Sequence, residues 1–302
     1  KYLDNYDARE WLRLEFQALR NCLDAIDHKK KKSEISQYLE DALRYRKLRQ
    51  TKYKVFLEKE LELETLEGLA NYTGFKLSTM EDIYKSAIAE ISQREGAQTY
   101  TRPFPYATGV AYGLIFDFLK IPWKSGLTHT YNFLQIYEQS KQKNILVTDE
   151  QVTKANARNN FAEIHSEESE RKTDNDRNIA YYVDLLSTKP TLSVKLADRF
   201  NYGMTFNMNG TIELPSLGTV YSSISGRDIS GKNFGTFRTL ADHATLGDAG
   251  ILITDDDYVF FPTPFKTDGN KIIGETYEIA LNDGWMVEKA DSKGNFVIKK
   301  KQ

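Results

Sequence analysis

The stretch Leu186-Ser-Thr-Lys-Pro-Thr-Leu-Ser-Val-Lys-Leu196 (LSTKPTLSVKL) contains the point at which the periodicity of the sequence changes. Before Pro190, apolar residues recur every three or four positions over long segments, which is the spacing of amphipathic helices. From Leu192 onward, apolar residues alternate with polar ones, as in strands with one buried face. Six of the 18 glycines lie in residues 1–190 and twelve in residues 191–302, so turns concentrate in the second part. The sequence therefore predicts an α+β fold, with an N-terminal multi-helix domain followed by a smaller antiparallel β-rich domain.

The same patterns predict the element boundaries. Three segments are expected: a helical domain (1–147), a polar helical connector (148–190) and a β-rich domain (191–302). Helices are predicted in the first two segments over 7–29, 33–54, 56–77, 80–92, 106–119 and 148–186, the last with a break near 174–176. Strands are predicted in the third segment over 192–196, 204–208, 219–224 and 251–254. A hairpin is predicted to join 276–281 to 285–289 through Asn282-Asp283-Gly284, before a turn leads into 296–299.

The composition is that of an ordinary globular protein, with 40% hydrophobic and 28% charged residues among 302. With 41 basic and 43 acidic residues the net charge is −2, so we expect no nucleic-acid partner. No segment approaches the ~20 apolar residues that a membrane-spanning helix needs, so no membrane span is expected. Cys22 is the only cysteine, which excludes an internal disulfide and a cysteine-based zinc cluster; we expect it to pack in the core.

Four charged residues fall on helix faces that are otherwise apolar. Glu15 lies in the middle of the apolar arc of the first helix, and Arg46 and Arg49 share the apolar face of the second. Glu67 lies on the flank of the apolar stripe of the third helix. Because a buried charge needs a partner, we predict an internal network that links Glu15 and Glu67 to the two arginines. Such a network either fixes the register of the helices or positions one carboxylate for a metal or a substrate.

The string Glu64-Thr-Leu-Glu-Gly-Leu-Ala-Asn-Tyr-Thr-Gly74 (ETLEGLANYTG) resembles a segment of the gluzincin group of zinc metallopeptidases. In those enzymes a helix with Glu-Gly-Leu-Ala or a close variant provides the glutamate ligand of zinc, and an upstream His-Glu-x-x-His helix provides two histidines. More specifically, the chain resembles a group of poorly characterised bacterial gluzincin-like proteins. Four blocks in the same order carry this resemblance: residues 9–19 (REWLRLEFQAL), 43–49 (LRYRKLR), 66–74 and 102–117 (RPFPYATGVAYGLIFD).

The resemblance implies that Glu67 is the glutamate ligand of a zinc ion that has three protein ligands and an open position for water. The residues that would hold the ligand helix in place are Glu15, Arg46 and Arg49. It also implies that Tyr106 or Tyr112 donates a hydrogen bond to the oxyanion formed during peptide hydrolysis. The alternative for either tyrosine is a core position with a satisfied hydroxyl. The bacterial family type implies an exported protein, periplasmic or secreted.

The sequence departs from the family pattern in its histidines. No two of them are four residues apart and no His-Glu-x-x-His occurs; the four are His28, His129, His165 and His243. Either the catalytic helix lies upstream of Lys1, which a start at Lys rather than Met favours, or the chain is a degenerate relative that binds without cleaving. We therefore expect the C-terminal portion, or a processed form, of a gluzincin-like zinc metallopeptidase that acts on a peptide substrate. By itself this chain would be inactive and would hold zinc only with the missing ligands. The alternative is a non-enzymatic binding or scaffold protein whose Glu/Arg network is structural.

Overall fold

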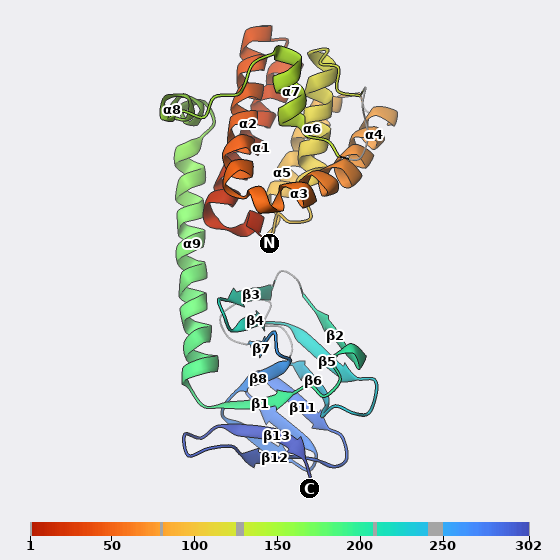
Figure 1. The fold of residues 1–302 in the computed structure, drawn as a ribbon, viewed down its shortest axis with the longest axis vertical. Coiled ribbons are helices and arrows are strands. Elements are labelled where there is room, and N and C mark those ends of the chain that lie inside the picture. The colour runs from red at the N-terminus through yellow and green to blue at the C-terminus, as the bar shows by residue number, and fades with distance from the viewer. Residues whose placement is uncertain (1, 79–80, 125–129, 208–209, 241–249, 302) are drawn as a thin grey trace. The chain divides into compact units, whose positions relative to one another are not determined.

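The computed structural model describes residues 2–78, 81–124, 130–207, 210–240 and 250–301 (Figure 1). Helices make up the N-terminal part and two sheets the C-terminal part, which confirms the predicted α+β order. The chain divides into two compact units, Lys1–Lys172 and Thr173–Gln302. The division falls within helix α9 (Phe161–Val183) and differs from the predicted boundaries at 147 and 190. The segment expected to be a separate connector is therefore shared between the two units.

The helical unit is a succession of helices joined by short turns. Before α9 its elements are η1 (Tyr2–Asp4), α1 (Tyr6–Asp27), α2 (Lys32–Lys52), η2 (Lys54–Phe56), α3 (Leu57–Leu63), η3 (Glu64–Gly68), α4 (Leu69–Leu77), α5 (Ile83–Glu95), α6 (Phe104–Phe118), α7 (Phe133–Lys141) and α8 (Asp149–Arg158). The elements α3, η3 and α4 follow one another without a break, so they form the single helical run predicted over 56–77. Within that run, η3 is a π-helical turn.

Two features of the helical unit differ from the sequence prediction. The polar stretch breaks at Asn159-Asn160 rather than near 174–176, because Asn160 has a left-handed backbone with φ 54°. Helix α7 is not predicted from the sequence at all. Its N-cap Asn132 accepts a hydrogen bond from the backbone N–H of Gln135 at 3.1 Å, a signal that identifies the start of this helix.

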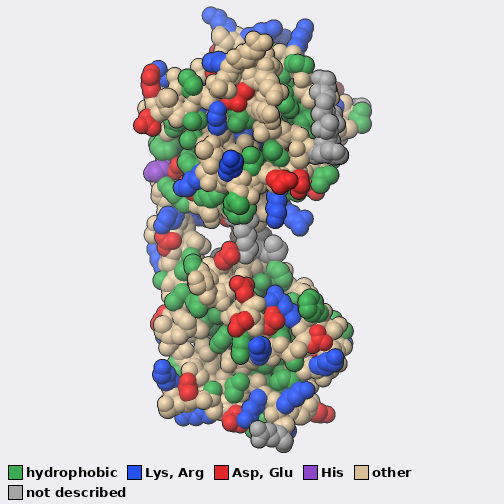
Figure 2. All heavy atoms as spheres, in the orientation of Figure 1, with side chains coloured by type: hydrophobic (Ala, Val, Ile, Leu, Met, Phe, Trp, Pro, Cys, Tyr) green, Lys and Arg blue, Asp and Glu red, His purple; other side chains and the backbone are tan. Residues whose placement is uncertain are grey.

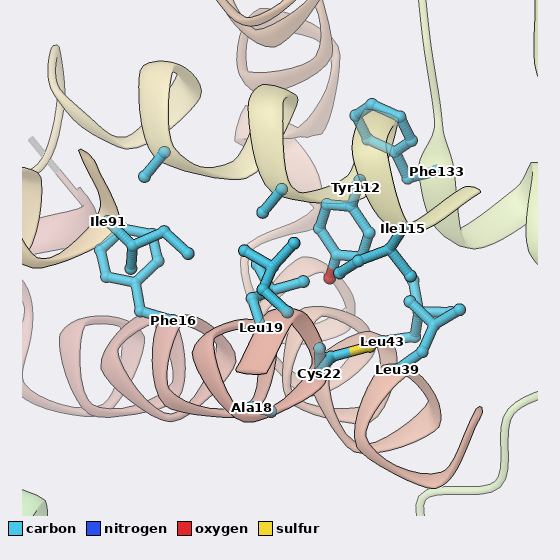
Figure 3. Close-up of a cluster of buried hydrophobic side chains, with 14 of the residues drawn as sticks. Phe16, Ala18, Leu19, Cys22, Leu39, Leu43, Ile91, Tyr112, Ile115 and Phe133 are labelled. Atoms are coloured by element: carbon cyan, nitrogen blue, oxygen red, sulfur yellow. The ribbon is translucent and has the colours of Figure 1, made fainter. Parts of the chain in front are cut away.

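The core of the helical unit forms where the apolar face of α1 packs on α2, α5 and α6 (Figure 3). Leu19 of α1 points toward α6, whereas Cys22 lies beside Leu39 and Leu43 of α2, and all four side chains are buried. Burying one large aliphatic side chain in this way contributes about 1.5–3 kcal/mol to folding. The Cys22 thiol donates to the carbonyl oxygen of Ile35 at 3.3 Å, which confirms the predicted core position of the cysteine.

Glycines let α6 approach η3 and α4 more closely than any other residue would allow. A Cβ atom added to Gly109 would lie 2.3 Å from the Cα of Gly68, and one added to Gly113 would lie 2.4 Å from the ring of Tyr72. The two α6 glycines are four residues apart and so share one face of the helix. This crossing fixes the π-helical turn against α6.

The β-rich unit contains two sheets. Their strands are β1 (Thr191–Lys195), β2 (Tyr202–Phe206), β3 (Thr211–Leu214), β4 (Gly218–Tyr221), β5 (Ile224–Asp228), β6 (Gly235–Thr239), β7 (Ile251–Ile253), β8 (Tyr258–Pro262), β9 (Phe265–Asp268), β10 (Lys271–Gly274), β11 (Tyr277–Leu281), β12 (Trp285–Lys289) and β13 (Phe296–Lys300). One sheet has the order β12-β13-β1-β8-β7-β4-β3 and the other the order β2-β5-β6-β11-β10-β9. Neighbouring strands are antiparallel except for β1 and β13. Inward side chains of both sheets share one core; the rings of Phe237 (β6) and Phe261 (β8), for example, are 5.4 Å apart.

Two strand predictions need correction. The segments 277–281 and 285–289 are strands joined through Asn282-Asp283-Gly284, but they belong to different sheets and do not pair as a hairpin. The Asn282 side chain explains the crossover, because it donates to Asp228 at 2.9 Å and so ties the connection to another loop of the unit. The segment predicted as one strand over 219–224 contains parts of two, β4 and β5, again in different sheets.

Among the described residues, no helix combines the length and the apolar character needed to cross a bilayer. On the face drawn in Figure 2, basic and acidic side chains are interspersed.

Candidate functional site

Five glutamates lie in the run from α3 into η3, and three of them are hydrogen-bonded to side chains of other elements. Glu60 and Glu64 are buried, whereas Glu67 is half-buried. A π-helical turn changes the direction in which successive side chains point, and such turns are frequent at functional sites. Both glutamates of the turn accept hydrogen bonds from α6, Glu64 from the hydroxyl of Thr108 and Glu67 from that of Tyr106.

The buried carboxylates form an ion network with two arginines of α2. Arg46 donates to Glu15 at 2.7 Å and to both carboxylate oxygens of Glu64 at 2.7 Å each. Arg49 donates to Glu15 at 2.8 Å and to Glu60 at 2.5 Å. All five side chains are at most 1% exposed. The structure thus brings Glu15, Arg46 and Arg49 together as predicted, but the third-helix partners are Glu60 and Glu64.

The predicted membership of Glu67 in this network is wrong. Periodicity placed Glu67 only on the flank of the apolar stripe, and the π-helical turn, which sequence spacing does not reveal, changes which glutamates point inward. A sequence signal for the correct partners exists, because Glu60 and Glu64 are four residues apart and therefore lie on one helix face.

Charge balance inside the network is uneven, since three carboxyl groups share two guanidinium groups. Burial opposes ionisation of Glu15, but the charges of Arg46 and Arg49 outweigh it and hold the pKa of this carboxyl below its usual range. Burial and the nearby charge of Glu64 instead raise the pKa of Glu60 well above the usual value. Glu60 therefore favours the protonated form more than Glu15 does. The Nε of Arg49 is a buried donor without a partner among the described residues.

Of the two candidate tyrosines, Tyr112 belongs to the network. Its hydroxyl donates to Glu15 at 2.9 Å, its ring lies 4.5 Å from the guanidinium carbon of Arg46, and its side chain is fully buried. Burial, followed by the charge of Glu15, raises the pKa of Tyr112 well above its usual value. The structure therefore does not support an oxyanion role for Tyr112, because its hydroxyl has no access to a substrate.

The other tyrosine pairs with Glu67 at the edge of the helical unit. The Tyr106 hydroxyl donates to the Glu67 carboxylate, and both side chains are half-buried. This hydrogen bond is the main cause that raises the pKa of Tyr106. The Arg94 guanidinium lies over the Tyr106 ring at 4.7 Å and is held there by Glu90 at 2.8 Å. Asn71, one helical turn after Glu67, donates to the backbone carbonyl of Tyr106 at 3.0 Å and fixes the approach of the two helices.

The described residues of this chain do not by themselves complete a zinc site. A catalytic zinc ion needs three protein ligands, and no group of three or more His, Cys, Asp or Glu side chains in the described ranges is gathered to hold a metal. His28 contacts Asp24, and His165 contacts Glu10. His129 and His243 lie outside the described residues. Glu67 is thus a half-exposed carboxylate that could serve as one ligand of a metal whose other ligands come from elsewhere.

The chain is a two-unit α+β protein. Its helical unit encloses an ion network and presents the Glu67–Tyr106 pair at its surface. Comparison with protein-family models, with curated proteins and with solved structures finds no match to this chain.

Proposed function

We propose that the helical unit contributes Glu67 and Tyr106 to the active centre of a gluzincin-like zinc metallopeptidase. On this proposal the two histidine ligands come from a His-Glu-x-x-His segment that this sequence does not contain, and the substrate is a peptide. The observation that carries the proposal is the separation of roles among the glutamates. Glu60 and Glu64 are enclosed by guanidinium groups, while Glu67 is free of them and reaches the surface.

The surroundings of Glu67 suit a metal ligand. The helical turn that carries Glu67 is held in place on both sides of this residue. Arg46 binds Glu64, one turn before Glu67, and α6 packs on Gly68, immediately after it. A zinc ion bound there would supply a polarised water as nucleophile. The Tyr106 hydrogen bond orients the carboxylate, as groups behind metal ligands commonly do. Since the hydroxyl hydrogen is engaged by Glu67, we assign Tyr106 to positioning of the ligand in place of the oxyanion role implied by the resemblance.

The experiment starts upstream of Lys1 in the coding sequence. If a His-Glu-x-x-His segment is encoded there, the full-length protein is assayed for zinc content and peptidase activity with Glu67→Gln and Tyr106→Phe. Glu67→Gln should lose the metal and activity, and Tyr106→Phe should weaken zinc binding about 10–100-fold. Glu62→Gln, which changes an exposed glutamate of α3, is the matched control and should retain both. Full activity in Glu67→Gln would remove this residue from the site.

The second candidate is a non-enzymatic binding or scaffold protein. The observation that favours it is the burial of the whole Glu/Arg network. Buried ion pairs that no ligand can reach fix how the helices pack against one another, which is a structural role. On this alternative, the coding sequence holds no upstream His-Glu-x-x-His, and Glu67→Gln changes neither zinc content nor stability by a measurable amount.

A further inference from the structure

The outer face of the six-stranded sheet holds a broad groove of about 780 Å³ in the β-rich unit. Strand register aligns two rows of side chains across this face. The first row runs through Gly203, Arg227, Thr236, Ala280 and Lys271. The second row runs through Thr205, Ser225, Arg238, Glu278 and Ile273. Because residues alternate between the two faces of a strand, these side chains point away from the shared core.

The floor of the groove is made of small side chains and its sides of cations. Ser225, Thr236 and Ala280 stand at the centre of the face, where bulkier residues would fill the groove. Arg227 and Lys271 flank them on the first row and are exposed. Neither of these two cations has an ion pair or side-chain hydrogen bond with another described residue. The groove therefore carries positive charge that no carboxylate of the described residues neutralises, in a chain whose net charge is −2.

The carboxylates that line the groove are already engaged. Glu278 accepts a hydrogen bond from Arg238 at 2.7 Å, and both side chains remain partly exposed. Asp228 accepts hydrogen bonds from the backbone N–H groups of Ser230 and Asn233 at 3.0 Å each, so its charge is turned into the loop after β5. A ligand in the groove consequently meets the unpaired cations first. This charge pattern selects an anion.

The spacing of the cations selects an extended ligand. Arg227 and Lys271 are three inter-strand steps apart, which at ~4.8 Å per step separates their strands by about 14 Å. When both side chains stand upright from the sheet, one small anion does not contact both. An extended acidic peptide would normally be recognised through backbone hydrogen bonds at a strand edge, whereas the strands that carry Arg227 and Lys271, and the two strands between them, are each paired on both sides. Sugar hydroxyls, by contrast, can bond to the hydroxyls of Ser225 and Thr236 in the floor.

We propose that this face binds an acidic oligosaccharide that carries uronate carboxylates along its length. The Arg227 guanidinium is a planar fork that pairs with a carboxylate through two parallel hydrogen bonds, and Lys271 meets a second carboxylate further along the chain. The hydroxyl groups of the floor contact the sugar ring between them. This binding site lies in the β-rich unit and is independent of the metal-ligand role proposed for Glu67.

Titration calorimetry of the full chain with hexagalacturonate at low salt tests the proposal. Arg227→Gln and Lys271→Gln should each weaken binding at least about tenfold, since each removes a charged hydrogen-bond donor. The matched control is the double variant Lys289→Gln and Lys293→Gln, which removes two exposed charges from β12 and the following turn and should leave affinity within about twofold. Ala280→Phe keeps all charges but fills the floor, and it should abolish binding.

Four outcomes would overturn the proposal. The first is equal affinity for neutral cellohexaose, which would show that the cations have no role. The second is binding of polyglutamate as tightly as hexagalacturonate, which would indicate recognition of any acidic polymer, including peptides. The third is normal binding by Ala280→Phe, which would place the ligand outside the groove. Absence of any binding to hexagalacturonate also rejects the proposal, and thermal melts of each variant establish that the chain is folded.

Discussion

Replacing Arg46 by Met should destabilise the helical unit more than any change of an exposed arginine. The substitution keeps an unbranched side chain of similar length but removes the hydrogen bonds to Glu15 and Glu64, all at 2.7 Å and all without solvent exposure. Removing one partner of a buried ion pair costs about 3–5 kcal/mol. Two carboxylates lose a partner here, so we expect a loss near the upper end of this range, about 5 kcal/mol.

The assay is thermal unfolding of the full chain followed by circular dichroism at 222 nm, where the helical unit dominates the signal. A unit of this size loses roughly 2–4 °C of Tm for each kcal/mol, so Arg46→Met should lower the helical transition by ~10–20 °C. The matched control is Arg102→Met, because Arg102 is exposed and should change stability by no more than about 0.5 kcal/mol. A Tm for Arg46→Met close to that of Arg102→Met would refute the reasoning.

The pH dependence provides a second, independent check on the same variant. Without Arg46, Glu64 has no guanidinium partner and Glu15 keeps only Arg49, so burial shifts these carboxyls toward the protonated form in the folded state. The folded variant then binds more protons than the unfolded chain, so its stability should fall as pH rises through the folded-state pKa values. Arg46→Met should therefore lose less stability at pH 5 than at pH 8. An equal loss at both values would contradict the electrostatic explanation.

Three further predictions follow from the same contacts. Gly109→Ala should lower the free energy of unfolding in urea by at least about 1–3 kcal/mol, because the added Cβ would meet the Gly68 backbone at 2.3 Å. Gly74→Ala is the control: no atom lies within 4 Å of its added Cβ, so it should stabilise the chain by up to ~1 kcal/mol. Equal effects of the two substitutions would contradict the close helix crossing. Burial raises the pKa of the Cys22 thiol, so a thiol reagent at pH 8 should modify it only after denaturation, and rapid labelling of the native chain would disprove its enclosure. The pKa of Glu15 is lowered in the folded chain, so its ion pairs stabilise the folded state at pH values above the unfolded-state pKa of about 4.3, and this stabilisation is lost as the pH falls below that value. Glu15→Gln lacks this titrating group, so its urea midpoint should fall less between pH 5 and pH 3 than that of the unchanged chain.

Sequence reasoning reached the components of the ion network but not its complete membership. Helical periodicity placed Glu15, Arg46 and Arg49 on apolar faces, and such positions require charged partners. It chose Glu67 over Glu64 because a regular helix of 100° per residue was assumed through a segment that contains a π-helical turn. The same assumption could not reveal that Glu67 faces Tyr106, since that pairing depends on how α6 crosses the turn.

In the β-rich unit, local patterns identified strands but not their partners. The turn at Asn282-Asp283-Gly284 has the sequence of a hairpin connection, yet the chain changes sheets there because Asn282 is bound to the loop after β5. The groove on the outer sheet face also depends on register, which aligns Arg227 with Lys271 across strands that are far apart in the sequence. Neither pairing leaves a local signal.

By itself, the sequence determined the α+β order, the buried positions of Cys22 and Glu15, and the helical run that carries Glu67. These features depend on the spacing of apolar residues within one element, which is a local property of the chain. The tertiary structure alone decided which glutamates meet the arginines, that Tyr106 and not Tyr112 is accessible, and where the cations of the outer sheet gather. Those outcomes depend on helix crossings and strand pairing, in which contacts join residues separated by many positions along the chain.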